Sequence, residues 1–142
     1  MRVLAVDHGT KRIGLAVSDE LGIIAQPLAF LPAEPFAAFL DRLQQIIEEK
    51  DVALLLVGMP RNLDGSDGPA ARTVQEFVAV LTRALTVPIQ TWDERLTSAQ
   101  ANRLLIQGGV RRDQRKEKVN QMAAAILLQS YLDSRQRGVT DG

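Results

Sequence analysis

Residues 2–18, RVLAVDHGTKRIGLAVS, constrain the fold of this chain most, because they place one carboxylate, Asp7, between two apolar runs. The first run ends at Asp7 and the second follows a Gly-Thr-Lys-Arg bend, which predicts a strand, a tight turn and a returning strand. An aspartate at the end of an apolar run lies where a buried strand emerges at the rim of a sheet. We therefore expect the Asp7 side chain to be held rigidly and half desolvated. The alternative is an aspartate that only binds backbone amides of its own turn.

Apolar spacing along the rest of the chain predicts a mixed α/β order. A third strand is expected over residues 23–31, with Pro27 as an edge or bulge, and helical spacing follows from Phe36 to Ile47. The run Val52–Val57 is fully apolar and too short for a helix, so it predicts a central parallel strand. The later elements are a helix that begins near Pro69 and ends before Pro88, a strand over residues 89–92, a short helix from Thr97 closed by Gly108 and Gly109, and a long apolar-rich helix over residues 119–132.

Length and composition exclude several classes of protein. The 142 residues predict one domain over residues 1–142, with a frayed polar tail over residues 134–142. The 17 basic and 17 acidic residues give zero net charge, so nucleic-acid binding would need a local basic patch. The absence of cysteine excludes disulfides, thiolate metal sites and thiol catalysis, and no apolar run is long enough to span a membrane. We expect a soluble, cytoplasmic protein.

Acidic side chains follow two predicted strands that lie far apart in the sequence. Asp7 ends the first strand, and Asp93 and Glu94 follow the last one. Because the carboxyl ends of parallel strands meet at one edge of a sheet, where α/β proteins bind ligands, these acids are expected at one rim. Paired carboxylates there can bind hard divalent cations through oxygen. Two such ions about 4 Å apart activate water and stabilise the leaving oxygen in phosphodiester cleavage.

A basic segment over residues 110–118, VRRDQRKEK, holds five basic residues against two acidic ones. No helical or strand period supports it, so one interpretation is a solvated linker. The other is a contact with the phosphates of a polyanionic substrate, which adds affinity without sequence readout. The cations of this segment are Arg111, Arg112, Arg115, Lys116 and Lys118.

Four blocks occur in order along the chain: DHGTKRIGLAVSD, GMPRNLDG, DERLTSAQA and VNQMAAAILLQSYL. In order and spacing they resemble the signature blocks of the YqgF/RuvX family of Holliday-junction-resolvase-like proteins and pre-ribosomal RNA nucleases. The resemblance implies an RNase H-like fold, a five-stranded mixed sheet flanked by helices on both faces. It also implies a nuclease that uses Mg²⁺ or Mn²⁺ and processes the 5′ end of pre-16S ribosomal RNA, with branched or single-stranded DNA as further substrates. The partners implied are nucleic acid and pre-ribosomal particles, and we expect a monomer or weak dimer.

Two positions match the acidic metal ligands of that family and a third departs from them. Asp7 matches the ligand on the first strand and Glu94 the second acid, whereas the third acid, on the last helix, is here Asn120. An amide oxygen can ligate Mg²⁺ but removes one negative charge, which should weaken a second metal. Asn120 ligates, or Glu117 one turn earlier substitutes for it, or one of two metals is bound loosely. Asp93 points to the opposite side if its strand extends that far.

Residues near these acids have more than one interpretation. Lys11 and Arg12 in the first turn, and Arg95 after Glu94, are candidates for contact with substrate phosphate, but turn cations are often solvated and Arg95 could instead pair with a carboxylate. His8 is the only histidine. Strand alternation turns its ring away from the side of Asp7, which favours a structural role.

Loop and glycine positions complete the candidate set. Asp64 and Gly65 predict a turn, beside which Arg61 or Asn62 could face substrate. Gly9, Gly14 and Gly58 are expected to permit close backbone approach or positive φ rather than to take part in chemistry.

Two alternatives to a nuclease follow from the same motifs. Asn120 favours a nucleic-acid-binding ribosome-assembly factor with weakened catalysis. The turn Asp7–Thr10 also resembles the phosphate-binding hairpin of actin-like ATPases and sugar kinases, which share the core. Those enzymes need two such lobes, and this sequence has one such hairpin.

Overall fold

The computed structural model describes residues 1–60, 68–94 and 122–135. Its strands are β1 (Arg2–Asp7), β2 (Arg12–Ser18), β3 (Ala25–Pro32), β4 (Val52–Met59) and β5 (Ile89–Asp93). They form one sheet in the order β3-β2-β1-β4-β5. β4 is parallel to both β1 and β5, whereas β2 is antiparallel to β1 and β3. The predicted five-stranded mixed sheet is thus confirmed, with the run that begins at Val52 as an inner parallel strand.

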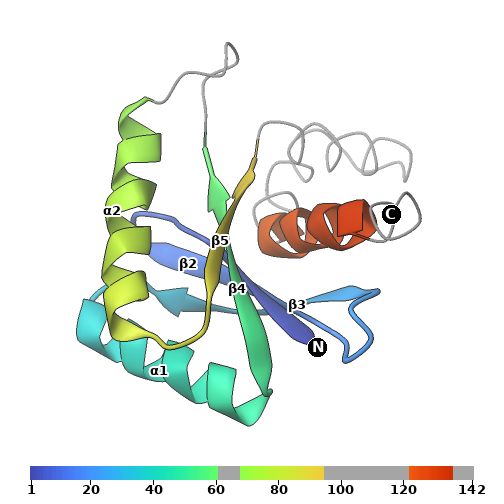
Figure 1. The fold of residues 1–142 in the computed structure, drawn as a ribbon. Helices are drawn as coiled ribbons and strands as arrows, with labels where there is room; N and C mark the ends of the chain where they lie inside the picture. Colours follow the sequence, from blue (N-terminus) through green and yellow to red (C-terminus); the bar gives the residue numbers. More distant parts are fainter. Residues whose placement is uncertain (61–67, 95–121, 136–142) are drawn as a thin grey trace.

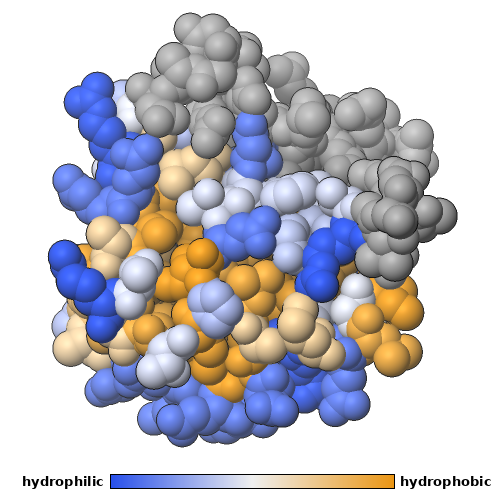
Figure 2. All heavy atoms as spheres, viewed as in Figure 1, coloured by the Kyte–Doolittle hydropathy of each residue, from blue (hydrophilic) through white to orange (hydrophobic). Residues whose placement is uncertain are grey.

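Helices cover both faces of this sheet (Figure 1). Helices α1 (Phe36–Glu49) and α2 (Pro69–Ala84) lie on one face, and a helix over residues 122–135 lies on the other. Alternation along β1 explains the two layers, because Leu4 and Val6 pack with α1 and α2 while Val3 and Ala5 pack with residues 122–135. Figure 2 shows hydrophilic residues along the lower margin, over α1, with hydrophobic residues above them, as expected for an amphipathic helix. None of the helices in the described ranges is long and apolar enough to cross a bilayer.

β3 begins later than the sequence pattern predicted, and the cause is the Asp19 side chain. Its carboxylate accepts hydrogen bonds from the backbone N–H groups of Ile23 at 2.7 Å and Ile24 at 3.0 Å. These two amides therefore belong to the turn, and strand pairing starts at Ala25. The predicted third strand over residues 23–31 is corrected to Ala25–Pro32.

Several helix and strand ends also differ from prediction. β4 continues to Met59 and β5 to Asp93, while α2 ends at Ala84 because Leu85 is already extended. The last helix continues to residue 135, so residues 134 and 135, assigned to a frayed tail from sequence, are helical. The predicted short helix after Thr97 lies outside the described residues.

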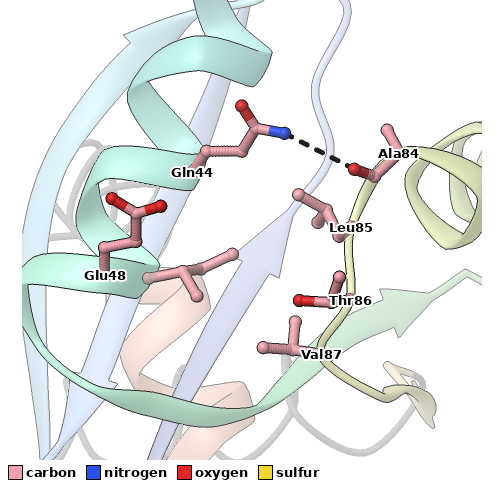
Figure 3. A pocket seen from close by; sticks show the side chains of 7 residues that line it. Gln44, Glu48, Ala84, Leu85, Thr86 and Val87 are labelled. Carbon is pink, nitrogen blue, oxygen red and sulfur yellow. Dashed lines mark hydrogen bonds between the residues drawn. The ribbon is translucent and has the colours of Figure 1, made fainter.

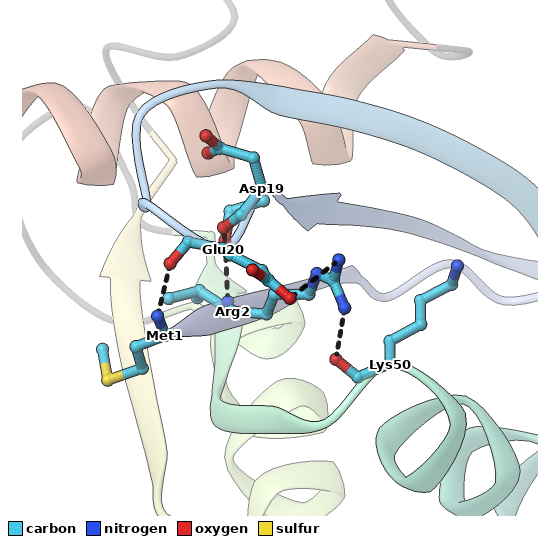
Figure 4. Close-up of polar contacts among 7 residues, drawn as sticks. Met1, Arg2, Asp19, Glu20 and Lys50 are labelled. Atoms are coloured by element: carbon cyan, nitrogen blue, oxygen red, sulfur yellow. Dashed lines mark hydrogen bonds and ion pairs between the residues drawn. The ribbon is translucent and has the colours of Figure 1, made fainter.

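The amino-terminal ends of the parallel strands form the rim opposite to Asp7. There Arg2 donates to the Lys50 carbonyl at 3.1 Å and lies 3.7 Å from the Glu20 carboxylate, and the Met1 ammonium donates to the Glu20 carbonyl (Figure 4).

A cavity of about 260 Å³ lies at this end, between α1 and the connection from α2 to β5 (Figure 3). Across it, the Gln44 amide donates to the Ala84 carbonyl at 3.4 Å, and Glu48 is the ionisable side chain among its lining residues. Because Glu48 is the one carboxylate among these lining residues, they offer no pair of anionic ligands for a metal ion.

Candidate active site

Asp7 and Glu94 meet at the carboxyl ends of the parallel strands. Asp7 ends β1, Glu94 directly follows β5, and the two carboxyl groups share a hydrogen bond. The Glu94 backbone N–H donates to the Met59 carbonyl at 3.1 Å, which fixes the start of this side chain next to β4. The structure therefore brings together the two acids that the sequence placed at one rim. Their role as metal ligands stays a prediction.

Gly58 allows Glu94 to reach Asp7. β4 lies between β1 and β5, so the Glu94 side chain must pass over β4. A Cβ atom on Gly58 would lie 2.2 Å from Glu94 Oε1 and 2.9 Å from its Cγ and Cδ atoms. Any larger residue at this position would occupy the space that Glu94 fills. Gly58 thus permits close approach, as expected, but what approaches is a site side chain rather than backbone.

A second glycine lies on the other side of Asp7. Gly14 on β2 pairs with Asp7, and a Cβ atom on Gly14 would lie 3.2 Å from Cε1 of Phe30 and 3.7 Å from Cβ of Asp7. The side chains of Phe30 and Glu94 therefore lie against the two glycines that flank Asp7, Gly14 on β2 and Gly58 on β4. Because both neighbours of Asp7 lack side chains, its carboxyl group is open towards Glu94 on one side and towards Phe30 on the other.

A cavity of about 260 Å³ opens beside Asp7. Lys11 and Arg12 line it and are exposed, and the Arg12 guanidinium lies 4.8 Å from the centroid of the Phe30 ring. The other lining residues are Gly9, Thr10 and Gly14. The two cations therefore lie next to Asp7, as predicted, while their contact with phosphate stays a prediction. Nothing in the sequence pattern distinguishes Phe30, because aromatic residues are common in strands, where they usually pack against neighbouring side chains.

The environment of the two acids favours a shared proton. Burial raises the pKa of Asp7, and the hydrogen bond with Glu94 and the nearby His8 oppose that rise. Burial raises the pKa of Glu94 to about 8, with further contributions from the hydrogen bond to Asp7 and the charges of Asp7 and Asp93. At neutral pH Glu94 therefore keeps its proton and donates it to Asp7. A divalent cation can replace this proton, because metal binding to carboxylates requires their deprotonated form.

His8 and Asp93 lie on the other face of the sheet. The His8 ring is 4.6 Å from the Phe77 ring of α2, measured between centroids, and burial lowers its pKa while Asp7 raises it. Asp93 pairs with Met59, whose side chain packs in the core below α2. The expectation that both side chains lie on the opposite face of the sheet from Asp7 and Glu94 is confirmed.

The remaining candidates lie outside the described residues. They are Arg61, Asn62, Arg95, Arg111, Arg112, Arg115, Lys116, Glu117, Lys118 and Asn120. Within the described ranges, no group of three or more His, Cys, Asp or Glu side chains is arranged to hold a metal ion. The half-buried pair Asp7 and Glu94 still fits Mg²⁺, which is commonly bound through one or two carboxylates and keeps several waters.

The sheet order, the helices on both faces and the acids at the carboxyl ends of β1 and β5 define an RNase H-like fold. The solved structure "T. thermophilus RuvC in complex with Holliday junction substrate" has this fold, with a TM-score of 0.55 at 18% identity over 96% of both chains. Residues 1–134 match the family model described as RuvX, Holliday junction resolvase, and this chain belongs to that family.

Relatives in the same family are similar over nearly their whole length. A protein of Geobacillus sp. (strain WCH70), named "Putative pre-16S rRNA nuclease", is 44% identical over 138 residues, which cover 96% of this chain and 100% of the relative. A protein of the same name from Desulforamulus reducens is 43% identical over 134 residues, which cover 94% and 98% of the two chains. The family resemblance read from the four sequence blocks is confirmed.

Proposed function

We propose that this protein is a divalent-metal-dependent nuclease that hydrolyses phosphodiester bonds in processing the 5′ end of pre-16S ribosomal RNA. The observation that supports this most is the half-buried Asp7–Glu94 pair, which shares a proton at the rim of an RNase H-like sheet. Relatives named as pre-16S rRNA nucleases support the RNA substrate. Branched or single-stranded DNA is a further substrate class, supported by the description of the family.

The chain's own residues would prepare the site for Mg²⁺ or Mn²⁺. Asp7 is fixed by β1, and Glu94 is fixed by its backbone hydrogen bond to Met59. When bound, a divalent ion supplies stabilisation of developing negative charge and a water of lowered pKa. The charge of Asp93, which raises the pKa of Glu94, also adds to the attraction for a cation.

We propose Asn120 as the third ligand from the last helix. Asn120→Asp is expected to tighten metal binding or to lower the Mn²⁺ requirement, because it restores a negative charge. Unchanged metal titration and cleavage in both Asn120→Asp and Asn120→Ala would remove this residue from the site and leave Glu117 as the candidate.

Cations near the acids would bind the substrate backbone. Lys11 and Arg12 lie beside Asp7, and we assign the same role to Arg95 and to the basic segment 110–118. Because the net charge of the chain is zero, binding depends on these local groups. We further propose that residues 1–142 act as one nuclease domain, a monomer or weak dimer, on pre-ribosomal particles in the cytoplasm.

The test is a cleavage panel with labelled single-stranded RNA, single-stranded DNA and a four-way DNA junction, each with Mg²⁺ or Mn²⁺. Wild-type protein is expected to cleave RNA, and Asp7→Ala and Asp7→Asn to abolish cleavage with an unchanged circular dichroism spectrum. Cleavage that survives in both variants would refute the assignment of Asp7. Binding without cleavage in the wild type would instead favour a ribosome-assembly factor, the alternative that Asn120 raised.

A further inference from the structure

The cavity beside Asp7 holds two kinds of group that a metal site alone does not require, namely cations and an aromatic ring. Lys11 and Arg12 supply positive charge, and Phe30 supplies an aromatic ring. Asp7, which also belongs to the acid pair with Glu94, forms one wall of the cavity. Gly14 forms the wall between Asp7 and Phe30, and its missing side chain lets the ring edge approach the sheet. A cavity that adjoins the acid pair and is lined by cations and an aromatic ring has the chemistry of a nucleotide subsite.

We propose that this cavity binds the unpaired base of a nucleotide next to the cleaved phosphate, stacked on the Arg12 guanidinium, which itself lies over the Phe30 ring. This inference rests on the proposed nuclease function and specifies the form of substrate that the site takes. A base that is splayed out of a strand can stack on an aromatic side chain or on the plane of an arginine.

The geometry of Arg12 and Phe30 supports a stacking role over a simple salt bridge to phosphate. The Cζ atom of the guanidinium lies over the ring, 4.8 Å from its centroid, which is the distance of a cation–π contact. The Arg12 guanidinium therefore contacts an aromatic ring at the mouth of this cavity. Lys11 is exposed at the same cavity and is suited to the phosphate of the bound nucleotide.

The size of the cavity limits what can enter. Its volume of about 260 Å³ is below the about 300–1,000 Å³ that is usual for drug-sized ligands, so it suits one base rather than a base pair. A base inside a duplex is held by its pairing and stacking partners and cannot enter without being unstacked. The site should therefore prefer a phosphodiester flanked by an unpaired nucleotide.

The experiment compares KM, kcat and base stacking in matched phenylalanine variants. The variants are Phe30→Leu, Phe30→Trp and the control Phe36→Leu, whose ring packs on Phe39 and Phe77 below the opposite face of the sheet. Cleavage of single-stranded RNA is measured with Mn²⁺, and stacking is followed in EDTA by the fluorescence of 2-aminopurine placed next to the cleaved bond. Arg12→Lys, which keeps the charge but loses the planar group, is a second variant at an exposed position.

Phe30→Leu is expected to raise KM by up to about 100-fold and to change kcat far less, because it removes the ring that supports the stacking guanidinium. It should also weaken the quenching of 2-aminopurine, whereas Phe30→Trp, which keeps an aromatic ring, and Phe36→Leu should both keep wild-type KM and quenching. Arg12→Lys should weaken quenching without a loss of charge.

Three results would contradict the proposal, and they are distinguishable. A wild type that cleaves RNA, together with Phe30→Leu and Arg12→Lys variants that keep wild-type KM and quenching, would refute the subsite and leave the nuclease function intact. A wild type that neither binds nor cleaves any strand would refute both. Equal KM values for single-stranded and fully paired substrates would also refute the preference for an unpaired base.

Discussion

Asp7 lies between two glycines, and each glycine makes room for a side chain from the strand beyond it. Gly58 on β4 accommodates Glu94, and Gly14 on β2 accommodates the ring of Phe30. A glycine in a strand normally weakens it, because backbone entropy is lost and no side chain packs. Here that loss is offset by the approach of two functional candidates to one carboxylate. At the residue scale, the absent side chains therefore shape the site as much as the acids do.

Gly58→Ala is expected to separate the two acids. The new Cβ atom would displace the Glu94 side chain, and misplacement by about 1 Å can lower an enzymatic rate by about 100-fold. The overcrowding should also lower the free energy of unfolding by about 1–3 kcal/mol. Both effects are measured against Glu94→Ala and the double variant. If the alanine acts through Glu94, Gly58→Ala should cost no stability in the Glu94→Ala background, and an equal cost in both backgrounds would contradict this role.

The shared proton predicts how stability depends on pH in metal-free protein. Glu94 has an ordinary pKa of 4.5 and a folded-state pKa of about 8, so the folded state binds more protons than the unfolded state between these values. Stability should therefore fall as pH rises from about 4.5 to about 8, and then level off. His8, whose pKa is lowered, acts in the opposite sense only below its ordinary value of 6.5.

Denaturant unfolding in EDTA between pH 6.5 and 9 separates the contribution of Glu94 to the pH dependence of stability from that of His8. The wild type should lose stability up to about pH 8, with a slope of at most about 1.4 kcal/mol per pH unit. Glu94→Gln, which cannot ionise, should give a flatter profile. A profile of equal slope in both proteins would rule out Glu94 as the titrating group.

At the scale of elements, the helix over residues 122–135 is joined to the sheet by side chains as well as by its apolar face. The Gln129 Oε1 accepts from the Ala25 backbone N–H at 2.9 Å, and its Nε2 donates to the Ile23 carbonyl at 2.8 Å. Near β5, the Trp92 indole donates to Ser130 at 3.3 Å and packs edge-on against Tyr131. These contacts attach the helix to both edge strands of the sheet, on the face that holds Asp7 and Glu94.

Gln129→Ala is expected to loosen the start of β3. The variant leaves the part-buried Ala25 N–H without its partner, while water can replace the partner of the exposed Ile23 carbonyl, so the free energy of unfolding should fall by about 1 kcal/mol. Hydrogen exchange at the Ala25 amide should accelerate. Gln44→Ala is the matched control, because its single exposed hydrogen bond should contribute less than about 0.5 kcal/mol. Equal losses in both variants would argue against a special role for Gln129.

At the scale of the whole molecule, the fold gathers charged side chains at one rim of the sheet, although the net charge of the chain is zero. The acids gather at the carboxyl rim of the parallel strands, where Lys11 and Arg12 lie beside them. The helices on both faces bury the inner strands β1 and β4, so the strands that end at this rim are part of the hydrophobic core. A ligand that compensates the acid pair should therefore stabilise the entire domain rather than one loop.

Divalent metal is expected to raise the melting temperature of the wild type. A ligand that binds only the folded state adds about 2.7 kcal/mol of stability at a concentration of 100 times its Kd. Asp7→Asn should remove this gain, whereas Asp41→Asn, an exposed acid on α1, should keep it. The measurement is thermal unfolding in a Mn²⁺ or Mg²⁺ titration, with proton release on binding as a second readout. A shift that survives in Asp7→Asn would place the metal elsewhere.

The amino-acid sequence by itself determined the elements and the face on which each side chain lies. The apolar run that ends at Asp7, the helical spacing from Phe36 and the run from Val52 encode local periods, and a period specifies burial without knowledge of distant residues. The same alternation correctly separated Asp7 from His8, and Glu94 from Asp93. The family resemblance needed only ordered blocks of sequence.

Only the tertiary structure decided what those residues touch. That Gly58 accommodates Glu94, that Phe30 lies over Gly14 and that Gln129 binds Ala25 all depend on the register of strands and helices that are distant in the sequence. The raised pKa of Glu94 has the same origin, since it needs burial and a second carboxylate at hydrogen-bonding distance. A glycine has no side chain, so its position in the sequence shows that space is available there but not which neighbouring side chain fills that space.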